Sequence, residues 1–120
     1  SMAELAVTFG VPIGEMKIGE QTYTLYRLKL IDYAYLEQTY NKPISDILSD
    51  PNISRSISII LDVLTLSIRK GDSTVTKEFL GEAIDPGDPE FQRCVQELLP
   101  KIFGSEAQGG ELKKGGQKNK

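Results

Sequence analysis

The first 28 residues alternate between apolar and polar positions with a period of two, which is the spacing of β-strands. Leu5, Val7 and Phe9 form the first such run, over residues 4–9. The glycines and proline at positions 10, 12 and 14 are expected to interrupt the chain after it. An open edge on this first strand would allow pairing between subunits, so the sequence admits a homo-oligomer.

A β-hairpin is predicted for the next stretch, with its turn near Gly19. Met16 and Ile18 precede the turn, and Tyr23 and Leu25 follow it at strand spacing on one face. Threonine and tyrosine, which favour pleated surfaces, fill the remaining positions. The N-terminal part of the chain is therefore expected to contribute strands and not helices.

From residue 29 onward the apolar period lengthens to that of an α-helix. The pattern predicts helices over residues 29–40, 43–49, 53–70, 77–84 and 89–103. In the first of them, Leu30, Tyr33, Ala34 and Tyr40 are expected to form the apolar face. Thr76 and Asp88 stand where N-caps are expected, and Pro100 should bend the last helix or end it early.

The helix predicted over residues 53–70 is expected to be the central element of the core. One apolar stripe on it comprises Ile53, Ile57, Ile60, Leu61, Leu64 and Ile68, and a second comprises Ile59, Val63 and Leu66. A helix that is apolar over so much of its circumference is usually surrounded by other elements. Asp62 lies on the less apolar edge, where we expect a solvated or capping carboxylate.

These elements predict an α+β, mainly α fold in which an N-terminal β-hairpin packs on a bundle of four to five helices. Residues 2–103 are expected to form a single globular domain, with Ser1 as a residue left by tag cleavage. Residues 104–120 are rich in glycine and lysine, and Leu112 is their only large apolar side chain. Such a stretch cannot offset its ordering entropy by burial, so a flexible, disordered C-terminal tail is predicted.

The charge balance argues against a nucleic-acid partner. The chain of 120 residues has a formal net charge of -3, and residues 104–120 hold four lysines and two glutamates, so residues 1–103 carry -5. So acidic a domain is a poor match for a phosphate backbone. No apolar run approaches the ~18 residues of a membrane span, and no secretory signal is recognisable. We therefore expect no membrane partner and a cytoplasmic location.

The groups most often used in catalysis are missing. The sequence has no histidine and a single cysteine, Cys94. The commonest general base and metal ligand is thus absent, and a thiol–imidazole dyad cannot form. No phosphate-binding or dinucleotide-binding motif is present. We expect a protein that is not an enzyme, with no catalytic, cofactor-binding or metal-binding residues, and a half-buried, inert thiol at Cys94.

All five tyrosines fall between residues 23 and 40. One interpretation is that most of them pack the hairpin against the first helix. The other is that some line a protein-binding surface, because tyrosine combines apolar area with a polar tip. The predicted partner-binding residues are Tyr26, Tyr33, Tyr35, Tyr40 and Leu66. A groove for an amphipathic helix would be lined by Tyr33, Tyr40, Leu66, Ile59 and Val63, unless the last two are simply internal.

The order of segments also carries a family resemblance. Residues 17–25 lead directly into residues 28–37, and residues 42–48, the apolar helix 53–70 and residues 76–85 follow. In this order they resemble the small tail assembly chaperones of long-tailed bacteriophages and prophages. The family has no catalytic residues to transfer, and no invariant binding motif is mapped onto this chain.

The resemblance implies a role in virion assembly. Members of this family bind the tape measure protein, keep that long helical chain soluble, and help the tail tube protein to polymerise around it. They act in the host cytoplasm and are generally absent from the mature virion. Many have a longer form made by a ribosomal frameshift, for which the tail from residue 104 would be the linker. The alternative is a structural or adaptor protein of a phage or prophage assembly, or another non-catalytic protein-binding domain.

Overall fold

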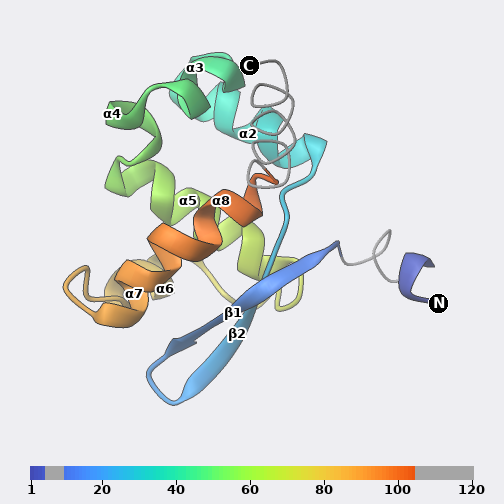
Figure 1. The fold of residues 1–120 in the computed structure, drawn as a ribbon, viewed down its shortest axis with the longest axis vertical. Coiled ribbons are helices and arrows are strands. Elements are labelled where there is room, and N and C mark those ends of the chain that lie inside the picture. Colours follow the sequence, from blue (N-terminus) through green and yellow to red (C-terminus); the bar gives the residue numbers. More distant parts are fainter. Residues whose placement is uncertain (5–9, 105–120) are drawn as a thin grey trace, which may run out of the picture.

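The computed structural model describes residues 1–4 and 10–104. Within these residues the fold is α+β and mainly α, as predicted, with an antiparallel hairpin followed by helices (Figure 1). The strands are β1 (Pro12–Ile18) and β2 (Gln21–Tyr26). The helices are α2 (Leu30–Tyr40), α3 (Ile44–Ser49), α4 (Pro51–Ser54), α5 (Ile57–Arg69), α6 (Lys77–Ala83), α7 (Pro89–Arg93), the π-helical η1 (Cys94–Leu98) and α8 (Leu99–Ile102). Most of the strand predicted over residues 4–9 and of the tail predicted over 104–120 lies outside the described residues. The prediction is wrong at Glu4, which belongs to a short helical turn over residues 2–4 and not to a strand.

The predicted hairpin is confirmed, and its turn contains Gly19 with a φ of 61°. The chain was expected to be interrupted over residues 10–14. This prediction is wrong for residues 12–14, because β1 begins at Pro12 and continues through Gly14. The strand absorbs this glycine in an irregularity of the register between Pro12 and Gly14. A Cβ atom on Gly14 would lie 2.7 Å from a methyl of Leu98, so the close packing of η1 on β1 requires glycine there.

The central helix α5 is shorter than predicted. The stretch 53–70 is divided into α4 and α5, because the Ser56 side chain accepts a hydrogen bond from the amide of Ile59 and starts a new helix. Ile57, expected in the buried stripe, is 61% exposed in the first turn of α5. Ile59 and Val63 are buried and belong to the core, whereas Leu66, the third member of the second stripe, is only partly buried. The hairpin and the helices α2, α4 and α6 all contact α5.

Helix α2 has the predicted length, and Tyr33 and Tyr40 of its predicted apolar face pack against the core, but the most deeply buried positions are others. Leu30, at the start of the predicted apolar face, is 85% exposed, while Asp32 and Leu36 are buried. The Asp32 carboxylate accepts a hydrogen bond from the main-chain amide of Lys29, the residue just before the helix. It also lies 2.6 Å from the ammonium of Lys70. This capping and pairing turn the Asp32 side of the helix inward, and Leu30 is left in solvent.

The last predicted helix runs almost its full length, from Pro89 to Ile102, despite Pro100. Pro100 has no amide hydrogen to bond the carbonyl four residues earlier, and its ring would clash with that carbonyl. The chain avoids the clash by widening into the π-helical turn η1, in which the amide of Leu99 bonds the carbonyl of Cys94. α7, η1 and α8 thus form one continuous rod that crosses α5 (Figure 1).

Candidate protein-binding site

Two of the predicted partner-binding residues lie together. Tyr35 of α2 and Leu66 of α5 line a hollow of about 340 Å³, which Asp62, Lys77 and neighbouring residues of α5 and α6 complete. Tyr35 is 45% exposed. Tyr40 lies beside this hollow, since its hydroxyl donates a hydrogen bond to the Asp62 carboxylate. The hollow mixes aromatic, aliphatic and charged groups, as the rim of a protein interface does.

Asp62 is not the solvated carboxylate that the sequence suggested. Its side chain is 3% exposed, and its two oxygens are held by the hydroxyl of Tyr40 and by the ammonium of Lys77 at 3.1 Å. Burial, followed by the bond to Asp62, raises the pKa of Tyr40. The hydrogen bond to Asp62 raises the pKa of Lys77. This network is satisfied internally, so it joins α2, α5 and α6 and leaves no free charge for a ligand.

The other two predicted tyrosines lie elsewhere. Tyr33 stacks on Phe103 with 6.1 Å between ring centroids, and its hydroxyl donates to the Phe103 carbonyl at 3.3 Å. Burial raises the pKa of Tyr33. The Tyr26 ring lies against Gly71. The five predicted residues therefore do not share one surface, and their part in partner binding stays a prediction.

A larger groove, which the sequence did not predict, lies between α3–α4 and the rod α7–η1–α8. Its volume is about 600 Å³. It is lined by Leu48, Ser54, Arg55, Ile60, Phe91, Gln92, Val95, Gln96, Leu99, Pro100 and Phe103. Leu48, on the α3 side, is 41% exposed. The sequence of α3 contained a signal for this groove. Its six residues include Ile44, Ile47 and Leu48, and one buried face of so short a helix does not require three apolar side chains.

A second hollow lies next to this larger groove. It is a cleft of about 180 Å³ between α5, α6 and the start of α7, and its lining is almost entirely apolar. Ile57 stands on its border, and Leu61, Leu80 and Ile84 contribute to its walls. Ile60 and Phe91 line both the cleft and the larger groove. The two hollows are thus adjacent, and together we call them the α5 groove.

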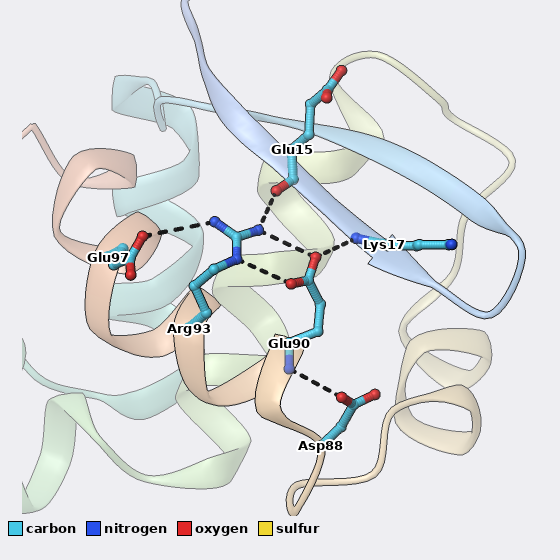
Figure 2. A network of polar contacts seen from close by, with 6 residues as sticks. All are labelled: Glu15, Lys17, Asp88, Glu90, Arg93 and Glu97. Atoms are coloured by element: carbon cyan, nitrogen blue, oxygen red, sulfur yellow. Dashed lines mark hydrogen bonds and ion pairs between the residues drawn. The ribbon is translucent and has the colours of Figure 1, made fainter.

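A polar network fixes the rod that forms one wall of the α5 groove (Figure 2). Asp88 accepts a hydrogen bond from the Glu90 amide at 3.0 Å and so caps α7. The Glu90 carboxylate accepts bonds from the amide of Lys17 in β1 at 2.7 Å and from the Arg93 guanidinium at 3.0 Å. Arg93 also donates to the Glu15 carbonyl at 2.8 Å. These bonds hold the rod against the hairpin and keep the wall rigid.

Two observations on the described residues concern metal binding and the single thiol. They contain no group of three or more Cys, Asp or Glu side chains placed to hold a metal ion. Cys94 is fully buried, not half-buried as expected, and burial raises the pKa of its thiol to about 12. A thiol in this state is a poor nucleophile. In the described ranges 1–4 and 10–104, no helix combines the length and the apolar character needed to cross a bilayer.

The fold and the α5 groove define the class of protein: a mainly helical α+β domain with an open, partly apolar groove at its surface. The chain matches no model of a known protein family, no curated protein and no solved structure.

Proposed function

We propose that this protein is a non-enzymatic tail assembly chaperone of a long-tailed phage or prophage, which binds the tape measure protein in the α5 groove. The observation that carries the proposal is the groove itself, in which a cleft with an almost entirely apolar lining and a larger hollow of mixed lining share Ile60 and Phe91 and are bordered by the exposed aliphatic side chains of Leu48 and Ile57. The order of segments along the chain supports the choice of partner.

The groove suits a helical ligand. Amphipathic helices bind by laying side chains at i, i+3, i+4 and i+7 into an apolar trough. The larger hollow and the cleft lie on either side of the wall formed by Ile60 and Phe91, and each has room for apolar side chains. Leu48 and Ile57, 41% and 61% exposed, would become covered in the complex. A long helical tape measure protein would offer many such stripes, and coverage of them would keep it soluble.

The remaining features of the proposed role are those that the family resemblance implies. The chaperone would act in the host cytoplasm, and the tail tube protein would displace it as the tube grows along the tape measure protein. It would then be absent from the mature virion. Since residues 1–103 carry a charge of -5, copies bound along one tape measure protein would repel one another and resist coalescence.

Co-expression tests the proposal. The full chain is produced together with the tape measure protein encoded near its gene, and the soluble fraction of that partner is measured with and without it. We expect a clear gain in soluble partner and co-purification of the two. Leu48→Ser and Ile57→Ser should each weaken the complex. Leu30→Ser, which removes an even more exposed leucine outside the groove, is the matched control and should bind normally.

Each outcome has a distinct meaning. No association and no gain in solubility would refute the chaperone function. Association that Leu48→Ser and Ile57→Ser leave intact would keep the function but move it to another surface. Stoichiometric amounts of the protein in purified particles would instead support a structural or adaptor role.

A further inference from the structure

The two outer edges of the hairpin are treated differently by the rest of the fold. In an antiparallel strand, the N–H and C=O of one residue point to the same side, and successive residues alternate. On the outer edge of β1, the Lys17 amide donates to Glu90 and the Glu15 carbonyl accepts from Arg93 (Figure 2). Side chains of the rod thus occupy one outward main-chain group of Lys17 and one of Glu15 on this edge.

The register of the hairpin shows which residues of β2 point their main-chain groups to its outer edge. Lys17 faces Thr22 and Glu15 faces Thr24. Because Lys17 and Glu15 point their main-chain groups outward, the residues opposite them do the same on the other edge. The next outward residue, Tyr26, is covered, since Ser67 Oγ accepts from its amide and donates to its carbonyl, both at 2.7 Å.

Thr22 and Thr24 have no corresponding cover. Within the described part of the chain, no side chain hydrogen-bonds the outward main-chain groups of either threonine. A hollow of about 240 Å³ lies beside them, lined by β2 and by Ile68, Gly71 and Asp72. On the outer edge of β2 the main-chain groups of Thr22 and Thr24 therefore have no side-chain partner among the described residues, whereas on the outer edge of β1 the rod supplies such partners. We call this part of β2 the open edge.

The open edge also lacks the devices that usually prevent strand pairing. Natural edge strands carry charged residues, prolines or bulges that discourage a further strand. β1 has Glu15, Lys17, Pro12 and an irregular register. β2 (Gln21–Tyr26) has no charged residue, no proline and a regular register from Gln21 to Leu25.

We propose that the Thr22–Thr24 edge of β2 pairs with the same edge of a second copy of this chain. The two hairpins would then form a continuous antiparallel sheet about a two-fold axis beside Tyr23. Thr22 would face Thr24 of the partner subunit, and the reverse pair would follow by symmetry. Each facing pair exchanges both main-chain hydrogen bonds, and threonines opposite one another are a favourable cross-strand pair.

The choice of a second copy follows from self-complementarity. Thr22 and Thr24 each point one N–H donor and one C=O acceptor outward. When a second copy of the strand runs antiparallel beside the first, each donor faces an acceptor of the other copy. The strand β2 itself carries no charged residue, so no like charges lie opposite each other on the paired strands. The contact is small, and we expect a dimer that depends on concentration. The inference is independent of the proposed function, because the edge lies outside the α5 groove.

Charge exchange tests the pairing and keeps the main-chain bonds of the hairpin. Because Thr24→Glu also faces Glu15 inside the hairpin, the circular dichroism spectrum and unfolding curve of each variant at low concentration are compared first, to show that the monomer is intact. The mass of the full chain is measured by sedimentation equilibrium from about 10 µM to about 1 mM. We expect wild type to move from monomer towards dimer. The double variant Thr22→Glu/Thr24→Glu places like charges opposite each other and should weaken the dimer at least about tenfold. The matched variant Thr22→Glu/Thr24→Lys places opposite charges there and should retain it.

Hydrogen exchange gives an independent readout on wild type. The amides of Thr22 and Thr24 should become protected as concentration rises, whereas the Tyr26 amide, bonded to Ser67, should be protected throughout. A monomer at every concentration would overturn the proposal. So would a dimer that the two double variants affect equally, or one that Val7→Asp abolishes, since the latter would assign the contact to residues 4–9.

Discussion

Tyr40 of α2 donates a hydrogen bond to the buried carboxylate of Asp62 in α5, at a distance of 22 residues along the chain. Lys77, the first residue of α6, holds the other oxygen of this carboxylate. One carboxylate therefore joins three helices. A buried charge is tolerated only where such partners satisfy it, so the contact makes the packing of α2 and α6 on α5 mutually dependent.

Replacement of Tyr40 by phenylalanine should destabilise the protein. Tyr40→Phe removes one partner of a buried carboxylate, and we expect a loss of about 1–3 kcal/mol in the free energy of unfolding. Urea denaturation followed by circular dichroism measures it. Tyr35→Phe, at a tyrosine that is 45% exposed, is the matched control and should change stability by less than about 0.5 kcal/mol. Equal effects of the two substitutions would contradict the assigned network.

Ser67 should be sensitive to loss of its hydroxyl. Ser67→Ala leaves both the amide and the carbonyl of Tyr26 without their partner, and we expect a loss of about 1–3 kcal/mol. Thr65→Val provides the comparison, because the Thr65 hydroxyl only adds a second bond to the Leu61 carbonyl of its own helix. It should cost clearly less. If thermal unfolding ranks the two variants in the opposite order, Ser67 does not hold β2 on α5.

Replacement of two α5 leucines by alanine should destabilise the protein to different extents, because Leu64 lies in the core and Leu61 lines the groove. Leu64 is 1% exposed, and Leu64→Ala should cost about 2–5 kcal/mol, because it leaves a cavity. The sequence assigned Leu61 to the same buried stripe, but Leu61 is only partly buried and lines the cleft. Leu61→Ala should therefore cost less than Leu64→Ala. Chemical denaturation of both variants decides, and a larger loss at Leu61 would mean that the cleft is closed in solution.

The Cys94 thiol should be almost unreactive in the folded protein. Its pKa of about 12, raised by burial from an ordinary value near 9.0, leaves very little thiolate at pH 8. Alkylation by iodoacetamide at that pH should be on the order of a thousandfold slower than in urea. Because the folded pKa is the higher one, the stabilising effect is complete below about pH 9 and falls as the pH rises above it. A native alkylation rate within about tenfold of the unfolded rate would exclude a buried thiol.

The local elements could be predicted well from the sequence. The hairpin, the caps at Thr76 and Asp88 and the bounds of α2 are encoded by nearby residues, since strand alternation, capping and proline act over a few positions. The binding site was predicted less well. The predicted tyrosine set is divided between separate places, and the α5 groove was missed because its walls come from segments about 40 residues apart.

The sequence by itself thus determined the fold class and the order of elements, because periodicity and turn residues report on short-range physics. Only the tertiary structure decided which apolar residues are core and which are surface. Asp32 and Asp62 are buried while Leu30 and Ile57 are exposed, and no pattern along one helix predicts this. The reason is that the partners of the two carboxylates, Lys70 and Lys77, come from distant segments and are brought close only when the chain folds.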